Sequence, residues 1–272
     1  MFNSKHPIIC APMNYVYSYE FACACLDADI TYGFFNRMVP EHDIKKLVAM
    51  YGPDRFFATL HLNNIDIHSI KKFMGCGIKH IEVPDAKQKV NSDFIKYLQK
   101  NNYTLYCKPS NQYSKYIDLF SGIVVKGGEA AARSNKNPLA DEFKNIKQKY
   151  AGKHLIASGG IHNAEMVDYY IAMGAQAVSI GTMFAASAES PLSAEAKQQI
   201  INTNRNKLTR FSNSQQALVF SEQSEDDENN TSSLKKGIQT GKQGHLFAGH
   251  AVDHITKIKS VAEIVADLTK TG

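Results

Sequence analysis

The stretch that decides the fold is Leu155–Phe184, LIASGGIHNAEMVDYYIAMGAQAVSIGTMF. It begins with an apolar strand, Leu155–Ala157, followed by the turn Ser158-Gly159-Gly160-Ile161 and a helix. A second apolar strand, Ala177–Ile180, ends in Gly181-Thr182. Glycine lacks a Cβ and tolerates positive φ, so at both strand ends the backbone N–H groups can approach an anion closely. The stretch therefore predicts two parallel strands that together bind a phosphate-bearing ligand.

The part of the chain before this stretch alternates between short apolar segments and segments with helical spacing. Short strands that are apolar throughout are typical of a parallel sheet buried on both faces. A doubly wound open sheet is the alternative, but a (β/α)8 barrel of about 250 residues places its phosphate site after its last two strands, as here. The six expected earlier strands are Pro7–Met13, Ile30–Phe35, Arg55–Leu62, His80–Val83, Thr104–Lys108 and Ile123–Lys126.

We expect residues 1–272 to form one α/β domain, a single (β/α)8 TIM barrel with a short C-terminal extension. Ala194–Arg210 is predicted as a helix, and Ser260–Leu268 as a closing amphipathic helix. Residues 221–243 begin with the acidic and polar run SEQSEDDENNTSS. Such a composition buries little apolar surface, so this segment is predicted to be a mobile polar loop within the domain.

Composition excludes several functional classes. The net charge is +5, but the lysines are spread over many predicted helices without a basic stripe, so we expect no nucleic-acid partner. No run approaches the roughly 18 apolar residues that span a bilayer, so no membrane association is expected. Five cysteines without framework spacing indicate a reducing, cytoplasmic location. No cysteine or well-placed carboxylate completes a site with His245, His250 and His254, so no metal is predicted.

Four segments carry recognisable motifs. Pro7–Met13 ends in Pro-Met, Gly128–Arg133 reads GEAAAR, Gly174–Phe184 continues the phosphate stretch, and Phe247–His250 reads FAGH. Together they resemble the nitronate monooxygenase family, formerly called 2-nitropropane dioxygenases, and its flavin-dependent enoyl-ACP reductase relatives. The resemblance covers about residues 7–190 and resumes near residue 244.

This resemblance implies FMN bound at the C-terminal mouth of the barrel. Lys126 stands where the family often has glutamine, and a cation there would stabilise the reduced flavin. An ion pair with Glu129 or a solvent-facing side chain are the alternatives for this lysine. The implied cofactor-binding residues are Ala11, Pro12 and Met13 beside the flavin rings, Lys126, and Ser158, Gly159, Gly160, Gly181 and Thr182 around the phosphate.

The catalytic position departs from the family pattern. The family's base is the histidine that ends Gly-x-Glu-Ala-Gly-Gly-His, and here Arg133 occupies that place. Arginine, with a pKa above about 12, cannot accept a proton near neutral pH, but its fork could bind an anionic substrate or a phosphate. His61, at the end of the third strand, is a further catalytic candidate, with a structural hydrogen-bonding role as the alternative. Glu129 is expected to brace its loop.

The sequence thus predicts an FMN-dependent oxidoreductase resembling nitronate monooxygenases, in which Arg133, Lys126 and His61 are the catalytic candidates. Because the histidine is replaced, a simple nitronate is not the expected substrate. One alternative is a flavin enoyl reductase that uses NAD(P)H as reductant, and another is a non-redox phosphate-binding barrel or an inactive homologue. The expected partner is a small-molecule substrate, and anionic substrates are among the candidates. Assembly into a homo-oligomer is left open.

Overall fold

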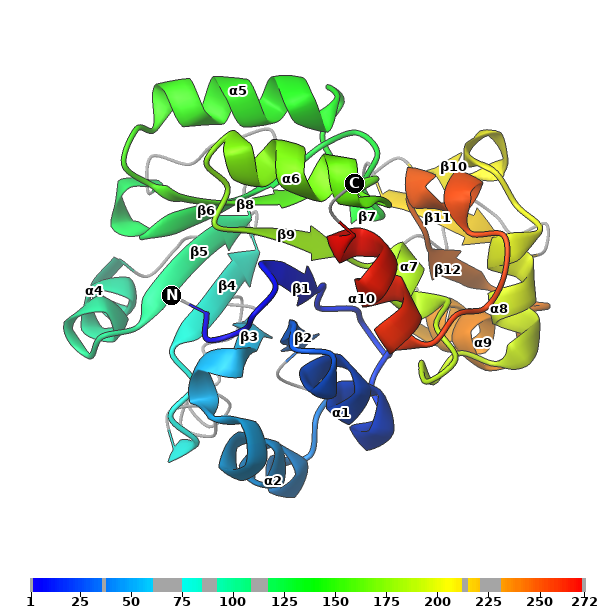
Figure 1. Ribbon diagram of the computed structural model, residues 1–272, viewed down its shortest axis with the longest axis horizontal. Helices are drawn as coiled ribbons and strands as arrows, with labels where there is room; N and C mark the ends of the chain where they lie inside the picture. The colour runs from blue at the N-terminus through cyan, green and yellow to red at the C-terminus, as the bar shows by residue number, and fades with distance from the viewer. Residues whose placement is uncertain are drawn as a thin grey trace.

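The computed structural model describes residues 2–35, 38–60, 75–84, 92–108, 117–211, 215–220 and 231–270. Eight parallel strands close into a barrel (Figure 1), which confirms the predicted fold. In barrel order they are β1 (Ile8–Cys10), β2 (Thr31–Phe35), β3 (Phe56–Thr59), β4 (His80–Pro84), β5 (Thr104–Lys108), β6 (Gly122–Lys126), β8 (His154–Ser158) and β9 (Ala177–Ile180). The barrel closes where β9 pairs with β1, with Ser179 opposite Ile9.

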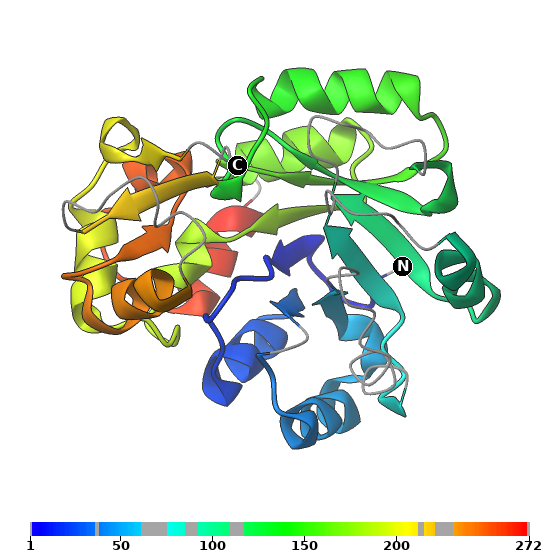
Figure 2. The ribbon, with the colours of Figure 1, turned by 180° about the vertical axis from the view of Figure 1, so that it is seen from behind.

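Helices cover the outside of the barrel in both views (Figures 1 and 2). The helix after β8 begins after Asn163, whose side chain accepts a hydrogen bond from the Met166 N–H at 3.0 Å. No helix within the described ranges is long and apolar enough to span a bilayer. The helices associated with the barrel are α1 (Tyr19–Asp27), α2 (Glu41–Tyr51), α4 (Ser92–Lys100), α5 (Leu139–Lys149), α6 (Ala164–Ala172) and α10 (Val261–Thr269).

The barrel interior has two levels, because residues two apart on a strand point to the same side. The deeper level is apolar and consists of Ile9, Phe57, Tyr106, Val124, Ile156 and Ala177, against which Phe2 packs. Two residues further along, the same strands turn mostly polar. This upper level lies at the C-terminal mouth and consists of Ala11, Thr59, Lys108, Lys126, Ser158 and Ser179.

A small antiparallel sheet that the sequence did not predict adjoins the barrel. Its strands are β7 (Ala132–Arg133), β10 (Thr209–Arg210), β11 (Gln215–Val219) and β12 (His245–Phe247). Both views place β10, β11 and β12 beyond the C-terminal ends of β8 and β9 (Figures 1 and 2). The chain that follows the barrel strands therefore returns to the end of the barrel where the glycine turns of Leu155–Phe184 lie.

The helix predicted over Ala194–Arg210 is wrong in its second half. Helix α8 ends at Ile201 (Ala194–Ile201), and a short 3₁₀ turn and β10 follow. The Asn204 side chain accepts a hydrogen bond from the Asn206 N–H, and the Asp253 carboxylate accepts one from the Arg205 N–H. These side-chain bonds to the backbone start a new turn instead of continuing the helix.

Part of the polar loop predicted over residues 221–243 is also corrected. Residues 231–240 form a helix, α9 (Thr231–Thr240), which buries Leu234 and Ile238. These two residues lie four apart and make an apolar helix face that the polar composition of the segment concealed. Residues 221–230 lie outside the described part of the chain.

Phe57 should be a major contributor to stability because it is fully buried in the apolar level of the barrel. We expect Phe57→Ala to lower the free energy of unfolding by about 3–5 kcal/mol. Ile258→Ala, at a site that is 41% exposed, should change it by less than about 0.5 kcal/mol. Urea denaturation measures both, and equal losses would contradict the two-level description.

Candidate active site

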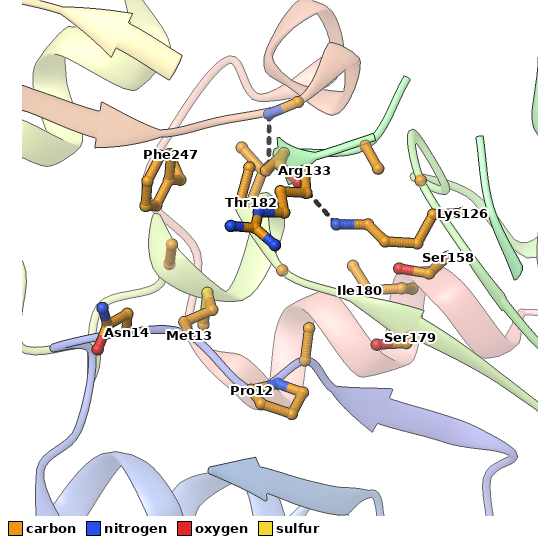
Figure 3. Close-up of a pocket in the computed structure, with 18 of the residues that line it drawn as sticks. Pro12, Met13, Asn14, Lys126, Arg133, Ser158, Ser179, Ile180, Thr182 and Phe247 are labelled. Carbon is orange, nitrogen blue, oxygen red and sulfur yellow. Dashed lines mark hydrogen bonds between the residues drawn. The ribbon is translucent and has the colours of Figure 1, made fainter. Parts of the chain in front are cut away.

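A cavity of about 500 Å³ opens at the C-terminal mouth of the barrel (Figure 3). Its volume lies in the range of about 300–1,000 Å³ that is usual for small-molecule sites. His61, the remaining catalytic candidate, lies outside the described residues. All the other predicted site residues line the cavity, namely Ala11, Pro12, Met13, Lys126, Arg133, Ser158, Gly159, Gly160, Gly181 and Thr182.

The turn after β8 requires glycine at two consecutive positions. Gly159 has φ 131° and Gly160 has φ 69°, values that residues with a Cβ rarely adopt. A Cβ on Gly160 would also lie 2.8 Å from the Cβ of Glu129. In the described part of the chain the N–H groups of Gly159, Gly160 and Gly181 have no backbone acceptor. The cavity thus offers donors for an anion where the sequence predicts them.

Thr182 links the cavity wall after β9 to the last part of the chain. It is the first residue of the short helix α7 (Thr182–Ala185), and its Oγ1 accepts a hydrogen bond from the Gly249 N–H at 3.0 Å (Figure 3). His250, which follows Gly249, donates its N–H to the Glu129 carbonyl at 2.9 Å. The Thr182 hydroxyl acts here as an acceptor, so its proton can still be donated to a ligand.

Glu129 braces the loop after β6, as the sequence predicts. Its carboxylate accepts the Leu139 N–H at the start of α5, at 3.0 Å from Oε2 and 3.3 Å from Oε1. A negative group at a helix N-terminus satisfies a free N–H and interacts favourably with the helix dipole. Through this bond Glu129 fixes the backbone of the loop after β6, which forms part of the cavity wall.

Lys126 makes neither of the contacts considered from the sequence. Its side chain is buried, and its Nζ donates to the Ala131 carbonyl at 2.8 Å. Burial, followed by the positive charges of Lys108 and Arg133, holds the pKa of Lys126 well below its usual 10.5, while Glu82 opposes the shift. A fixed positive charge is therefore disfavoured here until an anion comes near.

A polar network of three residues beside Lys126 was not predicted. The buried Glu82 carboxylate accepts the Thr59 hydroxyl at 2.7 Å and pairs with the Lys108 ammonium at 3.0 Å. These side chains come from β3, β4 and β5, and Thr59 and Lys108 line the cavity. The signal in the sequence was a polar residue two positions after an inward-facing residue, as for Thr59 after Phe57 and Lys108 after Tyr106.

Arg133 is brought to the cavity by the small sheet. It lies opposite Gln215 in the pairing of β7 with β11, and Figure 3 shows its guanidinium extending into the cavity. The preceding residue, Ala132, has φ 52°, in the left-handed region that favours glycine. Ala132, one of the two alanines at positions where the resembled family has glycine, thus adopts a conformation that glycine would form with less strain.

Comparison with known proteins agrees with the sequence resemblance. The family model for nitronate monooxygenase matches residues 154–271, from β8 to beyond α10. This match confirms the resemblance to nitronate monooxygenases over that region. No curated protein sequence matches the chain.

Solved structures share the fold at low sequence identity. FabK from Thermotoga maritima has a TM-score of 0.81 at 17% identity, and its M276A mutant has 0.80 at 18%; each match covers 98% of this chain and 92% of that one. The nitroalkane oxidase from Streptomyces ansochromogenes has a TM-score of 0.76 at 14% identity, covering 97% of this chain and 95% of that one. At these identities the likeness shows the common barrel.

Substitution of Gly160 and of Gly181 should affect stability to different extents. Gly160→Ala forces a side chain into φ 69° against Glu129, so we expect a loss of more than about 1 kcal/mol of unfolding free energy. Gly181→Ala should cost less, because its Cβ would meet only Ala11 and Met13 at 3.6 Å. Thermal or urea unfolding checks the order, and a larger loss at Gly181 would show it to be wrong.

Ala132 offers a stabilising substitution. Ala132→Gly relieves the strain of φ 52° and should raise the free energy of unfolding by about 1 kcal/mol. Ala131 lacks a positive φ, so Ala131→Gly should instead lower it by about 0.5–1 kcal/mol. Urea titration of the two variants should therefore give opposite signs, and the same sign for both would contradict this account.

Proposed function

We propose that this protein is an FMN-dependent oxidoreductase of nitronate monooxygenase-like type, acting on a small molecule other than a simple nitronate. One observation carries the proposal. Two adjacent parallel strands, β8 and β9, end in glycines whose N–H groups open into a large cavity. The family match to nitronate monooxygenase spans the same two strands.

The residues present fit FMN. The N–H groups of Gly159, Gly160 and Gly181 and the Thr182 hydroxyl would bind the phosphate. Pro12 and Met13, which follow β1, would lie against the flavin rings. FMN supplies hydride and electron transfer when bound, and the protein supplies binding, orientation and charge.

Arg133 is proposed to bind an anionic group of the substrate. Its guanidinium carries a permanent charge and a planar set of donors that matches a carboxylate or a nitro group. Phe247 and Leu246 of β12 line the same cavity and would keep water from the bound substrate. Because an arginine cannot accept a proton at neutral pH, any proton removed from the substrate must go to another group.

The absorption spectrum of the purified protein tests the cofactor. We expect a yellow protein with flavin bands that releases FMN on denaturation. A colourless protein that FMN does not reconstitute would refute the proposal, and a bound sugar phosphate would favour the non-redox alternative. The predicted reductant is tested by adding NADH or NADPH under anaerobic conditions, which should remove the flavin absorption bands.

Gly181→Ala should weaken FMN binding at least about tenfold, equivalent to about 1.4 kcal/mol, because a methyl group stands beside the proposed phosphate donors. Gly75 is a matched control, since its Cβ would meet nothing within 4 Å and the residue does not line the cavity. Gly75→Ala should leave the FMN dissociation constant unchanged. Fluorescence titration of both apoproteins measures it, and equal constants would remove Gly181 from the site.

A further inference from the structure

Lys126 and Arg133 place two different nitrogen groups in one part of the cavity. Figure 3 shows both end groups extending toward the same space, Lys126 from the end of β6 and Arg133 from β7. We propose that Lys126 is the general base of this cavity and takes a proton from a substrate carbon next to a nitro or carbonyl group, while Arg133 binds the oxygen that becomes negative. The substrate class rests on the proposed function.

The contacts of Lys126 favour an amine over an ammonium. Only 9% of the residue is exposed, and its Nζ donates to the Ala131 carbonyl at 2.8 Å. Within the described residues it makes no ion pair with a carboxylate. A buried ammonium needs more acceptors than this single carbonyl, because it has three N–H donors. An amine uses the carbonyl for one N–H and keeps a lone pair.

Two of the three neighbouring charges act in the same direction. Lys108 on β5 and Arg133 on β7 both disfavour a further positive charge at Lys126. Glu82 on β4 favours one, but its carboxylate is already paired with Lys108 and bonded to Thr59. Burial, as the largest cause, together with Lys108 and Arg133 keeps the pKa of Lys126 well below its usual value.

Among the described residues that line the cavity, Glu129 is the one carboxylate, in the loop that follows Lys126. Its two oxygens are directed to the Leu139 N–H at the start of α5. This arrangement keeps the carboxylate in a structural role and leaves the amine unneutralised. Within the described ranges, the fold therefore supplies a base without a carboxylate partner.

The proposed step is a proton transfer that balances by itself. The substrate C–H bond breaks, and its electron pair moves into the nitro or carbonyl group to give a nitronate or an enolate. The proton goes to the Lys126 lone pair, which becomes an ammonium next to the new anion. Arg133 stabilises that anion through its guanidinium. Because no electron leaves the substrate, the step needs no oxidant.

Hydrogen–deuterium exchange of nitroethane tests the step without using the oxidation. The protein, with whatever cofactor it carries, is incubated with nitroethane in D₂O, and proton NMR follows loss of the α-hydrogens above the buffer rate. Wild-type protein should accelerate the exchange. Lys126→Met and Lys126→Gln should reduce the protein-dependent rate at least about 100-fold, as expected for loss of a general base.

Lys197 provides a matched control. It is also a buried lysine, burial lowers its pKa, and its Nζ donates to one carbonyl, that of Ala188, at 2.8 Å. It does not line the cavity, so Lys197→Met should exchange nitroethane at the wild-type rate. Lys126→Arg keeps a positive charge but cannot accept a proton, and it should lose exchange while retaining the fold in thermal unfolding.

The pH profile separates a base from a structural residue. Exchange should rise with pH as Lys126 loses its proton and should level off above its pKa, with a midpoint below 10.5. Lys108→Met removes a neighbouring positive charge, which raises the pKa of Lys126 and moves the midpoint to higher pH. A midpoint that stays in place or falls would contradict the proposal.

Other outcomes overturn the proposal outright. These are a wild-type protein that exchanges no faster than buffer, or a folded Lys126→Met or Lys126→Arg variant with the wild-type rate. The result is independent of the cofactor assignment. Exchange that depends on Lys126 in a protein unable to bind FMN would refute the proposed function alone, and a yellow protein without exchange would refute the general base alone.

Discussion

Closure of the barrel by the pairing of β1 with β9 fixes which side chains face inward. In a closed sheet every strand has neighbours on both sides, and residues two apart share a direction. A shift of one residue in β6 would turn Lys126 toward the helices and bring Val125 inside. The apolar deeper level opposes such a shift, since it buries an inward residue on six of the strands. The position of the polar level thus depends on the packing beneath it.

The two sides of the cavity recognise a ligand in different ways. On the side of β8 and β9, the backbone N–H groups of glycines offer hydrogen-bond donors that carry no titratable charge. On the side of β5 and β6, Lys108 and Lys126 offer nitrogen groups, and burial, Lys108 and Glu82 all act on the pKa of Lys126. A ligand with a permanently charged end and an end where charge develops during reaction matches both sides. This division supports the FMN-dependent reaction proposed above.

The sequence predicts the strands and the glycine turns well because their signals are local. Short apolar runs mark the barrel strands, and Gly159, Gly160 and Gly181 mark the strand ends. The small sheet escapes prediction because β7 and β10 have two residues each and exist only through pairing with β11. The bond from Thr59 to Glu82 joins two strands, so its partners become visible only when the barrel order is known. The sequence likewise does not show where the Lys126 side chain points, because its burial and its bond to the Ala131 carbonyl depend on the folded barrel.

The last part of the chain completes a cavity that the first part begins. Arg210 donates to the Gly128 carbonyl, the Gly249 N–H bonds Thr182, and the His250 N–H bonds Glu129. During synthesis the chain emerges from its N-terminus, so all eight barrel strands precede these residues. The barrel strands are therefore synthesised before Leu246, Phe247, Gly249 and Ala251, which complete the cavity wall. A chain that lacked these last residues would leave this side of the cavity open.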